Sequence, residues 1–181
     1  MFNGWLTERS NRQRLAALSP RLRRLAFAWC GDEHLADDLT QETLAKALSS
    51  LHTLKRDNAL EGWAFAILAN CFRDHCRRSR ATDPFEEHAD DSQLSSDDQI
   101  TQQQNVLRVQ QAIARLSPPQ REVLLLVDLE SCSYAEVADI LGIPVGTVMS
   151  RLSRARQTLK QFLQPVKRTQ TTNRPFMERI K

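Results

Sequence analysis

Residues 131–162 read SCSYAEVADILGIPVGTVMSRLSRARQTLKQF, and this stretch predicts a helix-turn-helix with a basic second helix. Ser133 and Glu136 have the spacing of a capping box, in which each side chain satisfies a backbone donor at a helix start. Gly142 suits the left-handed conformation that ends a helix, and Pro144 suits the first turn of the next helix. The turn between the two helices is therefore short.

Both predicted helices have an apolar side, and the second also has a cationic face. The buried side of the first comprises Tyr134, Val137, Ala138 and Leu141. The stripe of the second comprises Val145, Val148, Leu152, Ala155, Leu159 and Phe162. Beside that stripe lies a face without carboxylates, formed by Thr147, Arg151, Arg154 and Thr158. Such arginines are usually only solvated. Here the capped helix, the Gly-x-Pro turn and the basic face occur together, which favours binding in a DNA major groove.

The composition of the 181-residue chain predicts an all-α fold. Hydrophobic residues make up 41%, enough for packed cores, and the sequence has only five glycines and almost no strand-like alternation. The formal net charge of +3 hides a segregation of charge. Basic residues gather in 73–80, 151–160 and 167–181, whereas acids fill 83–98. No signal-peptide core and no run of about 18 apolar residues is present, so we expect a soluble, cytoplasmic protein.

Three further helices are predicted before the acidic segment. The first covers 15–30, where Pro20 starts or kinks the helix. The second covers 33–51 and is expected to bury Leu35, Leu39, Leu48 and Leu51. The third covers 60–80 and has the clearest helical period, set by Leu60, Trp63, Ala64, Ile67, Leu68, Cys71, Phe72 and His75. The N-terminal part is therefore a helical bundle.

Two polar faces of this bundle stand out. The second helix carries a compact acidic patch of Asp37, Asp38, Gln41 and Glu42. On its own such a patch is usually a solvated helix face. The third helix gathers Asn70, Arg73, Asp74 and Arg77 on one side, and Arg78 and Arg80 continue the positive charge. Cations near a helix end favour the helix dipole, but an amide among arginines can also hydrogen-bond a base edge.

Residues 81–99 separate the chain into two parts. They contain seven acids and no Lys or Arg, and they hold too few apolar residues to bury a core. We therefore predict two small helical domains, an N-terminal helical bundle and a C-terminal helix-turn-helix domain, joined by a flexible acidic linker. The first predicted domain covers 1–80 and the linker 81–101. The second domain covers 102–164, and a loosely ordered basic tail follows at 165–181.

The sequence offers little support for catalysis or for a bound cofactor. The four cysteines, Cys30, Cys71, Cys76 and Cys132, form no CxxC pair and are expected to be reduced. Cys71, His75 and Cys76 could be imagined as metal ligands, but structural zinc usually needs four well-spaced ligands. No phosphate-binding glycine loop or activated nucleophile is recognisable. We therefore expect no enzyme activity, no cofactor or metal, and no small-molecule substrate.

These motifs resemble the extracytoplasmic-function (ECF) sigma factors, small two-domain members of the bacterial primary sigma factor family. DDLTQETLAKAL at 37–48 is similar to the family's polymerase-clamp docking helix. WAFAILANCFRDHCRRSR at 63–80 is similar to its promoter-melting helix. Residues 116–159, from LSPPQREV to RARQTL, resemble its reader of the upstream promoter element. The three motifs follow the family's order and cover most of 15–163.

The resemblance implies a role for each polar surface. The acidic patch would bind core RNA polymerase through Asp37, Asp38, Gln41 and Glu42. The promoter −10 element would be contacted by Asn70, Arg73, Arg77 and Arg78. The −35 element would be contacted by Thr147, Ser150, Arg151, Arg154 and Arg156. Met149 departs from the family, because many relatives carry Lys or Arg there, and a thioether cannot donate to guanine. The resemblance also implies regulation by an anti-sigma factor, often a membrane-bound one.

Two other classes of protein are compatible with parts of the sequence. A helix-turn-helix regulator that acts without polymerase would use the same C-terminal motif, but it leaves the acidic patch and the Asn70 helix unexplained. A resolvase-like recombinase would need an N-terminal catalytic domain with strands and an activated serine, and neither is visible.

Overall fold

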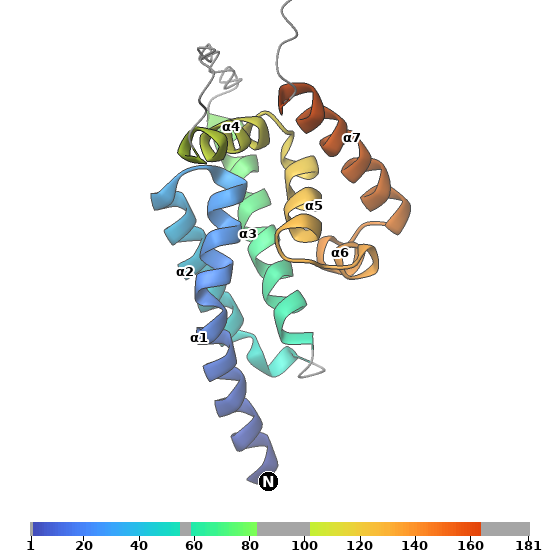
Figure 1. The fold of residues 1–181 in the computed structure, drawn as a ribbon. Helices are drawn as coiled ribbons and strands as arrows, with labels where there is room; N and C mark the ends of the chain where they lie inside the picture. The colour runs from blue at the N-terminus through green and yellow to red at the C-terminus, as the bar shows by residue number, and fades with distance from the viewer. Residues whose placement is uncertain (1, 55–58, 83–101, 164–181) are drawn as a thin grey trace, which may run out of the picture.

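The computed structural model describes residues 2–54, 59–82 and 102–163, and within these ranges the chain is helical and contains no strand. The elements, labelled in Figure 1, are α1 (Phe2–Cys30), α2 (Glu33–Ser49), η1 (Leu51–Thr53), α3 (Leu60–Thr82), α4 (Gln102–Ala114), α5 (Pro118–Asp128), α6 (Tyr134–Leu141) and α7 (Val145–Leu163). The predicted all-α fold is confirmed. Most of the predicted linker and the tail lie outside the described residues, so what we predicted for them stays a prediction.

Helices α1, α2 and α3 form the N-terminal bundle. Trp29 near the end of α1 stacks on Phe72 of α3, with ring centroids 5.5 Å apart and an interplanar angle of 29°. Helix α1 starts at Phe2, well before the predicted position, and runs through Pro20 without a break. Proline removes one helical hydrogen bond. The apolar burial of Leu18 and Leu22 on either side outweighs that loss.

Helices α4 to α7 form the C-terminal unit. Helix α5 begins with a capping box between Ser117 and Gln120, and Pro118 occupies its first turn. Its apolar residues Val123 and Leu126 are fully buried. Helices α6 and α7 cross as the predicted helix-turn-helix, so that α7 lies along the outside of the molecule (Figure 1).

Four side chains that were expected in the core are exposed. Leu48 is 47% exposed because it lies near the end of α2, while Tyr134 and Val145 lie at the starts of their helices. Phe162 is also exposed, and the guanidinium of Arg115 lies over its ring at 4.7 Å from the centroid. Helical periodicity identifies the apolar side of a helix, but it does not tell where the neighbouring helix stops covering that side.

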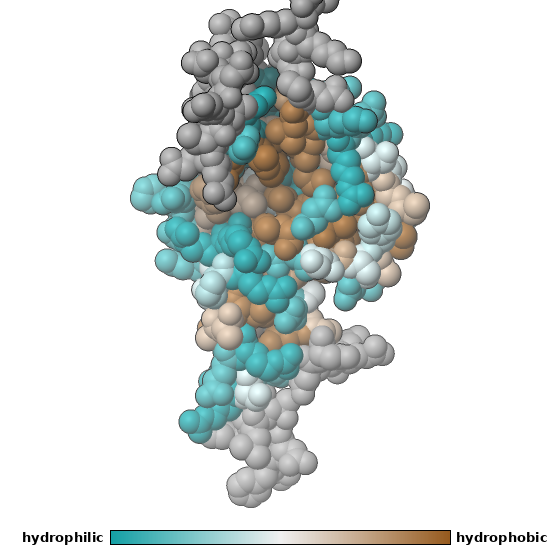
Figure 2. Space-filling model, viewed as in Figure 1, coloured by the Kyte–Doolittle hydropathy of each residue, from teal (hydrophilic) through white to brown (hydrophobic). Residues whose placement is uncertain are grey.

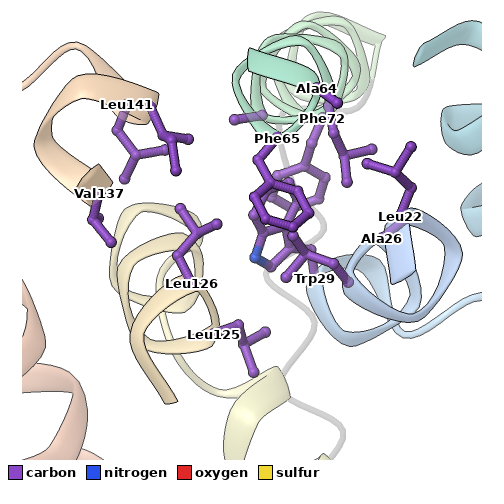
Figure 3. Packing of buried hydrophobic residues seen from close by; sticks show 14 of the residues in the cluster. Leu22, Ala26, Trp29, Ala64, Phe65, Phe72, Leu125, Leu126, Val137 and Leu141 are labelled. Atoms are coloured by element: carbon purple, nitrogen blue, oxygen red, sulfur yellow. The ribbon is translucent and has the colours of Figure 1, made fainter. Parts of the chain in front are cut away.

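The two units share one continuous apolar cluster. Buried residues of α1 and α3 lie next to buried residues of α5 and α6, and Figure 3 shows Phe65 and Trp29 facing Leu126 across this boundary. Figure 2 shows hydrophobic residues gathered at the centre of one face, around α5, with hydrophilic residues about them. No helix in the described ranges combines the length and the hydropathy that a membrane span requires.

Arg121 of α5 holds the ends of two helices together. Its guanidinium donates to the carbonyl oxygens of Ile113, at 3.2 Å, and Ala114, at 2.6 Å, in the last turn of α4, and to that of Leu116, at 3.1 Å. It also donates to the carbonyl of Trp29 at the end of α1. Carbonyls at a helix end have no partner within the helix, so one planar fork with five donors satisfies several of them. Burial lowers the pKa of Arg121.

We expect Arg121→Ala to lower the free energy of unfolding by about 2–3 kcal/mol, because partly buried carbonyls would lose their donor. Arg121→Lys should recover little of this loss, since a single ammonium cannot span the same carbonyls. Urea denaturation followed by circular dichroism measures both. Gln157→Ala, at an exposed position on α7, is the control and should change stability by no more than about 0.5 kcal/mol. Equal stabilities of wild type and Arg121→Ala would contradict the capping role.

Candidate nucleic-acid and polymerase interfaces

The helix-turn-helix is held by caps at both ends of α6. The backbone N–H of Ser133 donates to the Glu136 carboxylate at 2.8 Å, and the N–H of Glu136 donates to the Ser133 hydroxyl at 3.3 Å. The Ser133 hydroxyl also donates to the Glu136 carboxylate, at 2.7 Å, and the bonds to that carboxylate from the Ser133 N–H and hydroxyl lower the pKa of Glu136. At the other end Gly142 has a φ of 65°, the left-handed conformation that ends the helix. The turn is as short as the sequence predicted, and α7 begins at Val145.

Helix α7 turns its apolar stripe inward and its polar face outward. Val148, Leu152 and Ala155 are buried. Of the residues predicted to contact the −35 element, Ser150 and Arg154 are exposed, whereas Thr147 and Arg151 are half-buried. Met149 is 55% exposed, so its side chain is open to solvent on the outside of α7.

Arg156 differs from the other residues predicted for the −35 element. Its guanidinium donates to the carboxylate of Asp128 on α5 at 2.6 Å. This hydrogen bond raises the pKa of Arg156. The pair ties α7 to α5 within the C-terminal unit, so Arg156 positions the helix in addition to carrying charge.

The polar side of α3 presents Asn70 to solvent. Arg77 is exposed and pairs with Asp74 at 2.8 Å, one turn away on the same helix. Arg78 is also exposed and donates to the backbone carbonyl of Asp74 at 3.4 Å. Arg73 is half-buried, and its Nε donates to the Glu122 carboxylate of α5 at 3.2 Å. The four residues predicted for the −10 element thus share a helix, but one of them is engaged by the other unit.

The acidic patch on α2 is partly neutralised by cations of its own unit. Asp37 accepts from Arg23 of α1 at 2.5 Å, and Glu42 pairs with Lys46 at 2.7 Å, so that each partner lowers the pKa of its carboxyl. Asp38 and Gln41 are exposed. The patch is therefore present as predicted, with Asp38 and Gln41 as its most accessible members.

Two buried carboxylates were missed by the sequence reading. The Glu122 side chain is 3% exposed and the Glu130 side chain 1%. Burial raises the pKa of Glu122, which Arg73 and Arg151 partly oppose. A signal was present, because Glu122 lies one helical turn before the buried Leu125 and Leu126. A single acidic residue on the apolar side of a helix is expected to be buried, and a buried carboxylate needs a cation as its partner.

The cysteine side chains of the described residues are thiols, none of which takes part in a disulfide. Burial raises the pKa of Cys30 and Cys71, and that of Cys132 to about 11, which disfavours the nucleophilic thiolate. Within the described ranges no three His, Cys, Asp or Glu side chains come together as metal ligands would.

Comparison with known proteins defines the class of this fold. Residues 15–82 match the family model for Sigma-70 region 2, and residues 107–159 match the model for Sigma-70 region 4. These are the two regions whose helices carry the surfaces described above. Their combination in one chain defines an RNA polymerase sigma factor.

Curated relatives specify the family further. The chain is 37% identical over 157 residues to the ECF RNA polymerase sigma factor EcfG of Rhodopseudomonas palustris (strain TIE-1), covering 85% of each chain. It is 34% identical over 139 residues to the ECF sigma factor SigC of Mycobacterium tuberculosis (strain CDC 1551 / Oshkosh), covering 76% of this chain and 75% of the relative. The chain therefore belongs to the extracytoplasmic-function family of RNA polymerase sigma factors.

A solved structure agrees with this assignment. The sigma factor RpoE in complex with the anti-sigma factor NepR from Bartonella quintana superimposes with a TM-score of 0.69 and is 30% identical. The match covers 83% of this chain and 94% of that chain. Helices of both regions therefore occupy similar places in the two proteins.

We expect the Glu136 interaction to stabilise the fold at neutral pH and to fail in acid. A carboxyl whose folded pKa is lowered contributes stability above its unfolded pKa, about 4.3, and loses it as the pH falls through the folded pKa. As the pH falls from 5 through the folded pKa of Glu136, the free energy of unfolding should therefore decrease less in Glu136→Gln than in wild type. Urea titrations across that range measure the difference, and parallel pH profiles for the two proteins would contradict it.

Proposed function

We propose that three exposed surfaces of this sigma factor divide the work of promoter recognition. Helix α2 binds core RNA polymerase, α3 captures a base of the −10 element, and α7 reads the −35 element. One observation carries the proposal: Asn70, an exposed amide, stands beside arginines on a helix of region 2. A solvated helix face has no need of that amide, whereas base capture does.

The polymerase surface is centred on Asp38 and Gln41 because both are exposed on α2. Asp37 and Glu42 flank them, and each already has a cation of its own unit at hydrogen-bond distance. A basic surface of core polymerase would meet a patch of residual negative charge there. We expect Asp37 and Glu42 to contribute less than Asp38, because their charge is partly neutralised.

The −10 surface combines one base contact with several phosphate contacts. Taking a base out of the stack costs a few kcal/mol, and hydrogen bonds from Asn70 to the base edge would offset part of this cost. Arg77 and Arg78 are exposed nearby and would hold the flanking phosphates. Arg73 would join them once its pairing with Glu122 is broken. Such phosphate contacts supply affinity and salt dependence more than specificity.

The −35 surface lies on the outer face of α7. The exposed Ser150 and Arg154, together with the half-buried Thr147 and Arg151, would touch base edges or phosphates in the major groove. Arg156 would contribute charge from its position beside Asp128. Met149 offers an apolar contact, suited to a thymine methyl group, in place of a donor to guanine. The preferred upstream sequence is therefore expected to differ from that of relatives with Lys or Arg at this position.

As a promoter-specificity subunit, the chain would act without making or breaking a covalent bond, so we assign it no enzyme activity and no small-molecule substrate. Its working place would be the cytoplasm, where core polymerase and promoter DNA meet. The relative from Bartonella quintana is found with an anti-sigma factor. We propose a partner of the same kind for this chain.

A regulator that binds an operator without polymerase is the competing assignment for the helix-turn-helix. That assignment requires tight, specific binding of the free protein to duplex DNA. It gives no role to Asp38 on α2 or to Asn70 on α3, both of which are exposed. The sigma assignment gives a role to each.

We expect Asn70→Ala to impair promoter opening while sparing binding to upstream duplex DNA, because the amide would act only on an unstacked base. Run-off transcription with core polymerase on a promoter library first identifies a promoter that the wild-type protein uses. On that promoter, permanganate reactivity of the start region measures DNA opening. A fork template that is already open should restore much of the activity. Equal losses in opening and in upstream binding would remove Asn70 from this role, and no initiation by wild type on any template would refute the proposed function.

Arg154→Ala should weaken binding of the holoenzyme to the upstream element by roughly 1–3 kcal/mol if the guanidinium reads a base. Lys160→Ala is the matched control, because Lys160 is an exposed cation on α7 that lies outside the proposed set. Fluorescence anisotropy with labelled duplexes that vary at single positions measures both affinity and base preference. Loss of preference at one position is expected for Arg154→Ala alone. An unchanged affinity would make Arg154 a solvated side chain.

A further inference from the structure

Helix α1 contains a long stretch of positive charge. Residues 9–30 include six arginines and no Asp or Glu. Among the helices that the structure describes, only α7 also combines several cations with no acid. Helix α7 is the proposed reader of the −35 element, so the same composition accompanies a proposed DNA contact elsewhere in the molecule. Exposed arginines are usually only solvated, so their partners and positions decide what this stretch does.

Three of the six arginines are engaged within the protein. Arg21 and Arg24 both donate to the buried Glu130 carboxylate, each at 2.9 Å. Arg23 donates to the Asp37 carboxylate of α2 at 2.5 Å. These carboxylates offset the positive charge in the C-terminal half of α1, so the arginines of that half have a structural role.

Arg9, Arg12 and Arg14 form the other group, which we call the N-terminal basic segment. All three residues are exposed. The Nη1 of Arg14 donates to Oδ1 of Asn11 at 3.1 Å. That amide is neutral, so the hydrogen bond leaves the positive charge of Arg14 in place. Within two helical turns the segment therefore presents three guanidinium groups to solvent.

The basic segment lies on the part of α1 that projects beyond the start of α3 (Figure 1). Arg21 pairs with Glu61 in the first turn of α3 at 2.8 Å, which shows where the two helices begin to run side by side. At a rise of 1.5 Å per residue, Arg9 lies about 18 Å before Arg21 along the axis of α1. A large ligand can therefore reach the segment without contact with the rest of the bundle.

The apolar residues beside the segment indicate which polyanion suits it. Leu15 and Leu18 are buried in the bundle, and the exposed positions between them are Ala16 and Ala17. A helix that binds a membrane surface needs large apolar side chains on its exposed side, and residues 9–18 offer none there. A phosphate backbone needs only cations and room to approach, and small alanines leave that room. For a sigma factor the polyanion of this kind is promoter DNA.

We propose that Arg9, Arg12 and Arg14 form a further DNA-binding surface, which holds the phosphate backbone of promoter DNA outside the −10 and −35 elements. Such contacts add affinity and salt dependence and carry no sequence information. The proposed function gives DNA contacts only to α3 and α7, so this surface goes beyond it. The inference does not depend on which residues of those two helices touch bases.

The salt dependence of promoter binding tests this surface. The logarithm of affinity falls with the logarithm of salt concentration, with a slope of about −0.9 for each phosphate neutralised. In preformed holoenzyme the triple variant Arg9→Gln/Arg12→Gln/Arg14→Gln should therefore have a slope that is less steep by about 2 to 3. Between 50 and 200 mM salt, wild type should lose about 12- to 40-fold more affinity than this variant. Fluorescence anisotropy with a labelled promoter duplex measures both.

Two control variants separate charge from structure. Replacing the same three arginines by Lys keeps the charge, and an ammonium binds phosphate as a point charge, so the wild-type slope should be retained. Arg23→Gln removes an arginine of the same helix whose charge Asp37 already offsets, so it should change the slope little. Equal slopes for wild type and the triple Gln variant, or an equal change in Arg23→Gln, would overturn the proposal.

The length of the DNA tests where the contact lies. On a duplex that ends at the outer edges of the −35 and −10 elements, wild type and the triple Gln variant should bind equally. A difference that persists on this short duplex would place the contact inside the elements and overturn the proposal. If circular dichroism shows that the triple variant loses helix, Arg9→Gln alone carries the test on the long duplex, with a change in slope of about 0.9.

A membrane surface is the competing ligand for a basic helix. Cosedimentation with vesicles of phosphatidylglycerol and phosphatidylcholine measures it directly. We expect no difference between wild type and the triple Gln variant in this assay. Vesicle binding that the variant loses, together with equal salt slopes on promoter DNA, would assign the segment to a membrane and overturn the proposal.

Discussion

A buried carboxylate has to be paired, and this constraint governs how the two sigma regions lie together. Glu122 and Glu130 are almost completely buried, and the arginines that form ion pairs with them, Arg73, Arg21 and Arg24, come from region 2. An isolated charge in such a place would cost several kcal/mol, so α5 can pack on α1 and α3 only in the register that brings the arginines to it. The position of α5 in turn affects the positions of α6 and α7, because both helices contact α5.

The boundary between region 2 and region 4 combines extensive apolar contact with polar contacts that leave some donors without a partner. Trp29, Phe65 and Leu126 bury area without direction, which holds the regions together. The indole nitrogen of Trp29 and the Nη2 of Arg73 are buried without partners among the described residues, and such donors cost free energy.

The helix-turn-helix of region 4 is held in place by helix caps and buried apolar residues. Ser133, Glu136 and Gly142 define where α6 begins and ends, and the buried Val148 and Leu152 hold α7 against it. The polar face of α7 is therefore presented on a fixed helix. Met149 places an apolar, polarisable side chain at an exposed position of that helix.

Local rules were enough to predict much of this protein. Caps, glycine and proline positions and helical period predicted the helix-turn-helix and the all-α fold, and motif order predicted the sigma family. They failed where a neighbouring helix decides which residues are covered, because Leu48 and Tyr134 lie on apolar helix sides yet are exposed. They also failed at Pro20, which lies inside α1 and not at its start. Such failures arise because period and propensity describe one helix at a time.

The sequence by itself determined the elements, their apolar and polar sides, and the surfaces on α2, α3 and α7. Only the tertiary structure decided that Arg73 is held by Glu122, that Glu130 binds two arginines of α1, and that Arg121 joins the ends of α1 and α4. The partners that link the two regions are between 49 and 109 positions apart in sequence. No local pattern links residues so distant, and the partner of a buried charge is set by how whole helices pack.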